Sequence, residues 1–305
     1  MKAKWLWPAL LVVLVACGGS TRVGTFRPDR VLTFGDETSA ITADGRKWTV
    51  NGLGSTGAID CRANLNWTQY LTLSFGLPFA QCNPDNLPVS SINYAAPGAK
   101  VADVALQIDQ QFAAGGFDRN DLVTILAGTN DILEQYAQLA TLGEAAITAT
   151  LEARAGVLAS QVNRVGLAGG KVLIATVPDL SYAPFARAEQ AADPSIDRIG
   201  LLRRLVVRFN LQLRLGLIND GTMIGLVQAD EFVQSRIRFP AQLGFVNVAD
   251  AACAVALPDC TTATLVPNAN GNTWLWASPT ELGAGGHFQL GQFADSRARN
   301  NPFQE

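Results

Sequence analysis

Short apolar runs alternate with amphipathic stretches along most of the chain. The runs predict strands at 31–34, 89–94, 122–126, 172–177 and 222–227, and apolar residues at helical spacing predict helices at about 67–75, 101–113, 143–167, 195–218 and 283–297. Strands that alternate with helices form a parallel sheet covered on both faces. Because crossovers are right-handed, we predict an α/β fold with a three-layer, flavodoxin-like, doubly wound parallel sheet.

The first residues have the pattern of an export signal. Lys2 and Lys4 precede an apolar run over 5–16, which is too short to cross a bilayer comfortably. The run ends in Leu-Val-Ala before Cys17, which resembles a bacterial lipobox, in which the cysteine is lipidated and becomes the new N-terminus. A simple secretory signal with a spare thiol at Cys17 is the alternative.

Lipidation would set the location and one partner of the chain. Acyl chains such as palmitate on Cys17 would hold it on a lipid bilayer. Gly18, where an aspartate would favour retention, favours the outer membrane of the cell envelope. We expect a signal peptide at 1–16, a lipidated linker at 17–29 and a single domain at 30–305. The net charge of −3 and the absence of like-charge runs give no indication of nucleic-acid binding, and the oligomeric state stays open.

Four cysteines remain after Cys17, namely Cys61, Cys82, Cys253 and Cys260. An even number in an exported chain predicts two disulfides, and proximity along the chain favours Cys61–Cys82 and Cys253–Cys260. The only histidine is His287, and the cysteine spacings do not suit zinc. We therefore expect neither a metal nor a cofactor.

Three turns follow the first three predicted strands. They contain Gly35-Asp36-Glu37, Pro97-Gly98 and Gly128-Thr129-Asn130-Asp131. The carboxyl ends of parallel strands are where an open α/β sheet collects its ligands and catalytic groups. In order and position, the three turns resemble the first three blocks of the SGNH/GDSL hydrolases, a superfamily of lipases and esterases. That resemblance extends over about 31–294.

The resemblance implies a role for each turn. The family has a nucleophilic serine at the position of Glu37, and its oxyanion hole corresponds to the Gly98 N–H group and the Asn130 side chain. Its last block places a catalytic Asp three residues before a catalytic His. Alignment on Gly286-His287 puts Ser278 and Glu281 at those positions, whereas a rival register places Ser278 on the histidine itself. In both registers the catalytic triad is replaced.

Replacement of the triad removes the usual chemistry. Ester hydrolysis requires a hydroxyl activated by a base that a third group orients. Glu37 and Glu281 leave four alternatives: the two acids share a proton, Glu37 fills the oxyanion hole, the acids hold a divalent cation with Asp36 or Asp131, or the two are unrelated exposed acids. We expect Asp36 to cap its turn, Trp274 and Trp276 to pack in the core or at the rim, and His287 to lie on a helix surface or cap a helix.

The sequence therefore predicts an envelope lipoprotein with the SGNH/GDSL fold and without serine-hydrolase activity, that is, a pseudoenzyme. We expect it to bind a small ester, acyl or glycan ligand, or to act as a scaffold. The alternative is an active enzyme, either a lipase or esterase or an acid–base enzyme that uses Glu37 and Glu281.

Overall fold

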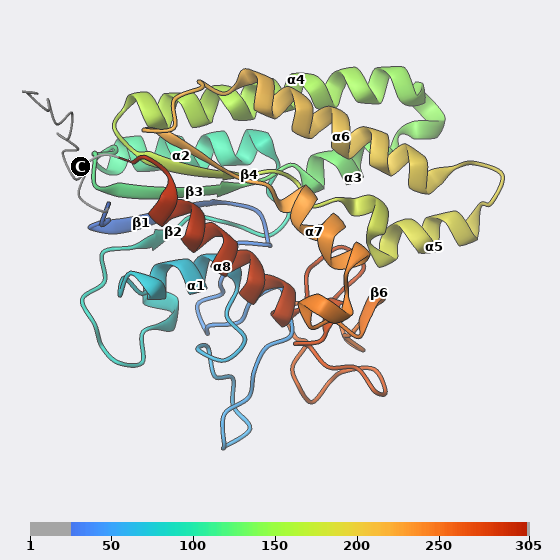
Figure 1. The fold of residues 1–305 in the computed structure, drawn as a ribbon, viewed down its shortest axis with the longest axis horizontal. Coiled ribbons are helices and arrows are strands. Elements are labelled where there is room, and N and C mark those ends of the chain that lie inside the picture. The colour runs from blue at the N-terminus through green and yellow to red at the C-terminus, as the bar shows by residue number, and fades with distance from the viewer. Residues whose placement is uncertain (1–25, 304–305) are drawn as a thin grey trace, which may run out of the picture.

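The computed structural model describes residues 26–303, and its centre is a parallel five-stranded sheet (Figure 1). The strands are β1 (Arg30–Gly35), β2 (Ile92–Asn93), β3 (Asp121–Leu126), β4 (Lys171–Ala175) and β5 (Ile224–Val227). They lie in the order β2-β1-β3-β4-β5, and all neighbours pair in parallel. This order is that of a flavodoxin-like doubly wound sheet, so the predicted fold class is confirmed.

Helices cover both faces of the sheet because alternate strand residues point to opposite sides. On one face, Leu32 and Phe34 of β1 pack in a core with α2 (Val101–Ala114), α3 (Thr129–Ala137), α4 (Leu139–Leu167) and α6 (Arg198–Gly216). On the other, Val31 packs in a core with α1 (Trp67–Ser74), α7 (Ala229–Arg238) and α8 (Ala284–Asn300). Figure 1 shows α4 and α6 side by side on the first face and α8 crossing the second.

The structure contains elements that the hydrophobic pattern did not predict. These are α3, α5 (Pro184–Ala192), α7, the short 3₁₀ turns η1 (Ala80–Cys82), η2 (Leu180–Tyr182) and η3 (Ala241–Leu243), and a two-stranded sheet of β6 (Asn247–Ala251) and β7 (Trp274–Trp276). The strand predicted at 89–94 is shorter, since β2 is an edge strand paired only to β1. The helix predicted from Gly143 begins earlier, and Gly143 itself is a non-helical break within it.

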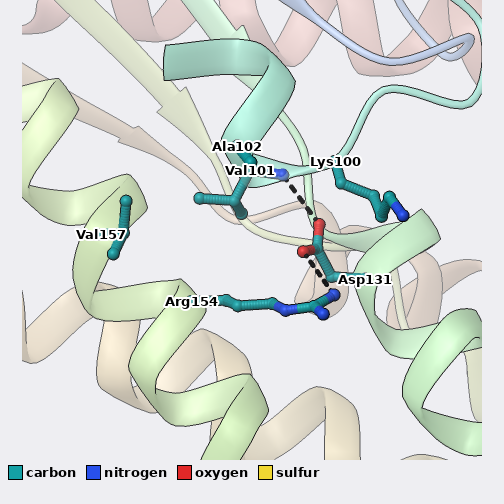
Figure 2. Close-up of a pocket in the computed structure, with 6 residues that line it drawn as sticks. All are labelled: Lys100, Val101, Ala102, Asp131, Arg154 and Val157. Atoms are coloured by element: carbon teal, nitrogen blue, oxygen red, sulfur yellow. Dashed lines mark hydrogen bonds and ion pairs between the residues drawn. The ribbon is translucent and has the colours of Figure 1, made fainter. Parts of the chain in front are cut away.

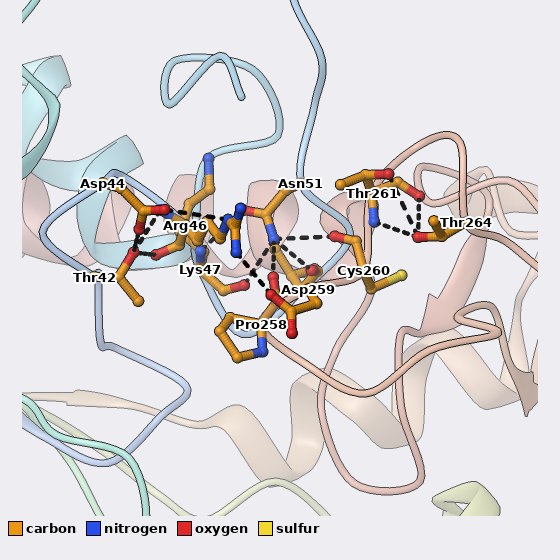
Figure 3. Close-up of polar contacts among 11 residues, drawn as sticks. Thr42, Asp44, Arg46, Lys47, Asn51, Pro258, Asp259, Cys260, Thr261 and Thr264 are labelled. Atoms are coloured by element: carbon orange, nitrogen blue, oxygen red, sulfur yellow. Dashed lines mark hydrogen bonds and ion pairs between the residues drawn. The ribbon is translucent and has the colours of Figure 1, made fainter. Parts of the chain in front are cut away.

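Two long loops at one end of the molecule are tied together (Figure 3). The Asn51 side chain donates hydrogen bonds to the carbonyls of Lys47, Pro258 and Cys260 at 2.9–3.0 Å. Disulfides join Cys61 to Cys82 and Cys253 to Cys260, which confirms the predicted pairing. These links fix segments that have little regular secondary structure of their own.

The described chain begins beside the C-terminal end of α8. The ring of Phe26 packs edge-on against Phe303 with 5.5 Å between their centroids. The predicted signal peptide and Cys17 lie outside the described residues. Between residues 26 and 303, no helix has the length and apolar character needed to cross a membrane.

Candidate functional site

The turn after β1 places Glu37 at the carboxyl edge of the sheet. Gly35 has a φ of +144°, and a Cβ atom there would lie 2.1 Å from the Leu126 carbonyl oxygen, so only glycine allows β1 to end this close to β3. The Gln107 side chain accepts from the Gly35 N–H at 2.9 Å and donates to its carbonyl at 3.0 Å. Asp36 Oδ1 accepts from the Thr38 N–H at 3.1 Å, as expected of a residue that caps the turn.

The Glu37 carboxylate lies between the second and third turns. Its Oε2 atom accepts a hydrogen bond from the Gly98 N–H at 2.8 Å and another from Asn130 Nδ2 at 2.9 Å. Both hydrogen bonds expected of a glutamate in the oxyanion hole are therefore present. Because an ionised acceptor forms the stronger class of hydrogen bond, this carboxylate is well held.

The two donors come from different elements, which the Asp131 carboxylate joins (Figure 2). Asp131, on α3 next to Asn130, accepts from the Val101 N–H at 2.9 Å and from Arg154 Nη1 of α4 at 3.1 Å. Burial raises the pKa of Asp131, while the Val101 N–H and Arg154 act in the opposite direction. The bond from Val101 fixes the start of α2, which follows the Gly98 turn, against the start of α3, and the bond from Arg154 fixes α3 against α4.

A close approach at Gly128 sets where α3 begins. Its φ is +124°, and a Cβ atom there would lie 2.6 Å from the Phe209 ring, so a larger residue would displace α3 from α6. The helix starts at the next residue, Thr129, and this places Asn130 in its first turn, facing Glu37.

Glu281 approaches the site from the segment before α8. It is buried, and its Oε2 atom accepts a hydrogen bond from Thr38 Oγ1 at 3.1 Å. Burial raises the pKa of Glu281 well above its usual value, and the negative charges of Glu37 and Asp36 raise it further. The neutral acid is therefore the favoured form of this side chain, and a neutral acid cannot accept a proton as a base.

Within residues 26–303, the Ser278 side chain makes hydrogen bonds to backbone N–H groups and none to the side chain of another candidate residue. Its Oγ atom accepts from the Glu281 N–H at 3.0 Å and so closes a turn. In this last block, Glu281 is the residue whose side chain hydrogen-bonds to the turn after β1.

A third carboxyl group lies behind Glu37. Asp36 is fully buried, and its Oδ2 atom has no hydrogen-bond partner within residues 26–303. Burial, and after it the charge of Glu37, raises the pKa of Asp36 well above its usual value. In the part of the chain that the structure describes, no three His, Cys, Asp or Glu side chains are arranged to hold a metal ion, so the geometry gives the cation alternative no ligand set.

The expectation for His287 was wrong. His287 is buried in the first turn of α8, and neither ring nitrogen has a hydrogen-bond partner among the described residues. The first four residues of α8 are all buried, because this end of the helix packs against β7, so no surface is left for His287 to occupy. Trp276 of β7 lies in the core, which is one of the two positions expected for it. Its indole N–H donates a hydrogen bond to the Val248 carbonyl at 3.1 Å.

Among the hydroxyls that the sequence offered to Glu281 were those of Thr38, Ser39 and Ser278, and Thr38 is the one that contacts its carboxyl group. Arg154 was missed. Thr38 stands next to Glu37 and supplies the hydroxyl that binds Glu281, but nothing in its pattern separates it from an ordinary turn threonine. Arg154 lies in the middle of α4 and reaches Asp131 only through tertiary packing. Its position on a helix with many polar residues gave no signal of this contact.

A hollow adjoins the Gly98 turn. It has a volume of about 490 Å³, and the residues that line it include Tyr94, Pro97, Gly98, Asp103 and Gln110. The Gly98 N–H donor to Glu37 is thus at the border of an open, mixed polar and apolar cavity.

Comparison with known proteins supports the family assignment. The family model described as GDSL-like Lipase/Acylhydrolase matches residues 31–263, which include the turns of Glu37, Gly98 and Asn130 but end before Ser278 and Glu281. A comparison with curated proteins gave no significant match.

Solved structures that resemble this chain include a lipase and an esterase. A lipase from a goat rumen metagenome is 12% identical with a TM-score of 0.52, over 88% of this chain and 97% of that one. An acetylxylan esterase from Geobacillus stearothermophilus is 16% identical with a TM-score of 0.47, over 92% and 99%. At 12% identity, the likeness to the lipase is one of fold. Since the family model covers most of the chain, this protein belongs to the GDSL-like lipase/acylhydrolase family, with the SGNH-hydrolase fold.

Proposed function

We propose that this protein is a catalytically silent member of its family, which binds a ligand, or serves as a scaffold, where its relatives hydrolyse esters. The observation that carries the proposal is the position of the Glu37 carboxylate, hydrogen-bonded to both the Gly98 N–H and Asn130 Nδ2. In a working serine esterase, donors of this kind stabilise the oxyanion of the tetrahedral intermediate. Here the protein's own side chain takes both of them.

Displacing Glu37 from these donors would be costly. Each hydrogen bond to a charged group contributes on the order of 1.5–3 kcal/mol, and a substrate carbonyl is a weaker acceptor than a carboxylate. A carboxylate at the nucleophile position would also form an anhydride with an ester, which is not a stable acyl-enzyme. The site therefore lacks both the free hole and the nucleophile.

The general base is missing as well. The group that reaches the site from the last block is Glu281, whose raised pKa favours the neutral acid. Thr38 already donates its hydroxyl proton to this group at 3.1 Å and is nearly inaccessible, with 3% of its surface exposed. Hydroxyl attack from this position has neither a base nor access to a substrate.

A ligand would lie in the hollow beside Gly98. Its lining combines the Tyr94 ring and Pro97 with the polar groups of Asp103 and Gln110. Rings of this kind and hydrogen-bonding side chains suit a small ester, acyl or glycan ligand, which presents both apolar surface and oxygen atoms.

We also propose that the protein is an outer-membrane lipoprotein anchored through Cys17. The support is the sequence alone: two lysines, an apolar run and Leu-Val-Ala before the cysteine. Full-length protein expressed in bacteria should incorporate labelled palmitate and partition into detergent, whereas Cys17→Ser should do neither. Palmitate labelling that survives Cys17→Ser would exclude lipidation at this residue.

The test of catalytic silence uses a fluorophosphonate probe and a short-chain p-nitrophenyl ester on the full-length protein. Neither labelling nor hydrolysis above a heat-denatured control is expected. The variant that combines Glu37→Ser, Ser278→Asp and Glu281→His should gain a trace of activity, since Gly98 and Asn130 remain. Each single substitution should gain almost nothing, because triad members act as a unit.

The contact between Thr38 and Glu281 supports one alternative, an enzyme that uses acid–base chemistry at this pair. If it is right, the wild type will hydrolyse the ester, and Thr38→Ala or Glu281→Gln will abolish the activity. Ser39→Ala is the matched control, because the Ser39 hydroxyl is turned away from the site and accepts from the Trp67 indole N–H. Hydrolysis with this pattern of loss would overturn the proposal of a silent site.

A further inference from the structure

A second cavity lies between α7 and α8 and shares no residue with the candidate site. It has a volume of about 270 Å³. Its lining comes from the N-cap and one side of α7 and from one residue of α8: Gln228, Glu231, Phe232, Ser235, Arg236 and Phe293. Phe293 is 38% exposed, so its ring offers apolar surface at this cavity.

Arg236 is the cation of this cavity. Its guanidinium lies over the Phe232 ring with 3.6 Å between Cζ and the centroid. It donates to Gln289 Oε1 at 3.1 Å, to Ser235 Oγ at 2.8 Å and to the Phe232 carbonyl at 3.3 Å. These contacts hold the guanidinium in one orientation, and all of its acceptors are neutral.

Within residues 26–303, no carboxylate lies within ion-pair distance of Arg236, and its Nη2 atom makes no hydrogen bond. Burial without a compensating charge lowers the pKa of Arg236 to about 10. The nearby arginine Arg214, by contrast, is paired with Asp230 at 2.8 Å. A half-buried cation without a counter-charge is costly, and an anion in the cavity would recover part of that cost.

The acid at the rim does not neutralise Arg236. The Glu231 carboxylate accepts from Gln228 Nε2 at 2.6 Å and lies 3.9 Å from Arg214, and its side chain is 61% exposed. It is therefore engaged on the side of α7 that faces Arg214 and is screened by solvent.

We propose that this cavity binds a small organic carboxylate, with its charged group on Arg236 Nη2 and its apolar part against the Phe293 ring. Arg236 offers a fixed planar donor, and Arg is the residue best suited to carboxylate geometry. Phe293 supplies exposed aromatic surface at the same opening. The volume suits a ligand of the size of benzoate or a short fatty acid.

The test measures benzoate binding to the full-length protein in detergent by isothermal titration calorimetry. Benzamide, the neutral analogue, and inorganic phosphate, an anion without an apolar part, are the comparison probes. We expect benzoate to bind in the millimolar range, and both comparison probes to bind at least about tenfold more weakly, since each lacks one of the two contacts.

Two substitutions assign the site. Arg236→Gln should weaken benzoate binding at least about tenfold, and Phe293→Ala should weaken it several-fold. Arg238→Gln is the matched control, because Arg238 is on the same helix, is exposed and stacks on Phe239 outside the cavity, so benzoate binding should be unchanged. If Arg236→Gln does not fold, as judged by circular dichroism, Arg236→Lys keeps the charge without the planar fork and should weaken binding several-fold.

Three results would overturn the proposal. They are an absence of benzoate binding at 50 mM (about fifty times the expected range), equal binding to wild type and Arg236→Gln, and phosphate binding as strong as that of benzoate. The last would show an anion site without the apolar contact. None of these results bears on catalytic silence at Glu37, since the two cavities share no residue.

Discussion

The burial of His287 predicts how the protein loses stability in acid. Both ring nitrogens lack hydrogen-bond partners among the described residues, and the side chain is 1% exposed. Burial, and after it the positive charge of Lys47, lowers the pKa of His287 to about 3 from an ordinary value of 6.5. In the unfolded chain the same imidazole takes up a proton near pH 6.5, so acid favours the unfolded state.

The magnitude follows from the width of this pH window. A histidine with a depressed folded-state pKa contributes stability that is complete above pH 6.5 and is lost as the pH falls toward 3. Each pH unit within the window is equivalent to about 1.4 kcal/mol. Between pH 7 and pH 5 the loss from His287 is therefore about 2 kcal/mol, and by pH 3 it reaches about 4 kcal/mol.

His287→Leu isolates this effect, because His287 is the only histidine in the chain. Asp36 and Glu281, whose pKa values are raised, act in the opposite direction, but they are present in both proteins and cancel in the comparison. Urea unfolding at pH 7 and pH 5 should give a wild type that loses about 2 kcal/mol more than His287→Leu over this interval.

Two results would refute the reasoning. Parallel loss of stability in wild type and His287→Leu between pH 7 and pH 5 would show that His287 titrates alike in both states. A single imidazole C2–H signal that titrates near pH 6.5 in the folded protein would show the same directly. Lys47, whose pKa burial lowers to about 8, keeps its charge throughout this interval and so does not contribute.

The remaining predictions concern the site and its supports. Glu281→Gln should raise the melting temperature at pH 7 by a few degrees, because glutamine keeps the hydrogen bond from Thr38 without needing a proton. The difference in melting temperature between the variant and wild type should widen as the pH rises above 4.5, and a constant difference would contradict this. Arg154→Gln should cost about 3 kcal/mol in urea unfolding, since it leaves buried Asp131 unpaired, while the exposed Arg164→Gln should cost at most about 1 kcal/mol. Loss of the Cys61–Cys82 disulfide should cost about 3 kcal/mol, because its loop is long enough to restrict the unfolded chain; an effect below that of the shorter Cys253–Cys260 loop would contradict the loop-entropy argument.

The sequence predicted the central sheet well because its strands are buried and short. The runs at 122–126 and 172–177 are mostly apolar on both faces of the strand, and such runs are typical of a strand that is covered on both sides. The strand predicted at 89–94 was too long, because apolar content at an edge strand does not tell how much of it pairs. Helices α3 and α7 were missed because each follows a strand-end turn at once and is only nine or ten residues long.

The sequence could predict the site residues that lie in turns at the ends of strands, but not the residues whose position depends on how the helices pack. Glu37, Gly98 and Asn130 follow strand ends, whose meeting at one edge is a consequence of the parallel sheet. Arg154 and His287 lie on helices, and their burial depends on which neighbour covers that helix face. A hydrophobic pattern carries no information about a buried polar side chain of this kind, so the expectation for His287 was wrong.

The three carboxyl groups of the site, on Asp36, Glu37 and Glu281, affect one another's ionisation. Asp36 and Glu281 are both buried, and the charge of Glu37 raises the pKa of each, so ionising either one beside Glu37 is unfavourable. Glu37 has what the other two lack, a pair of donors from Gly98 and Asn130 aimed at one oxygen atom. One negative charge in the cluster is thereby favoured, and it sits where an esterase of this fold would develop the charge of its intermediate. On our proposal that the catalytic triad has been replaced, the Glu37 carboxylate supplies permanently a charge that the Gly98 and Asn130 donors would otherwise stabilise only in a transition state, and this gives those donors a reason to remain.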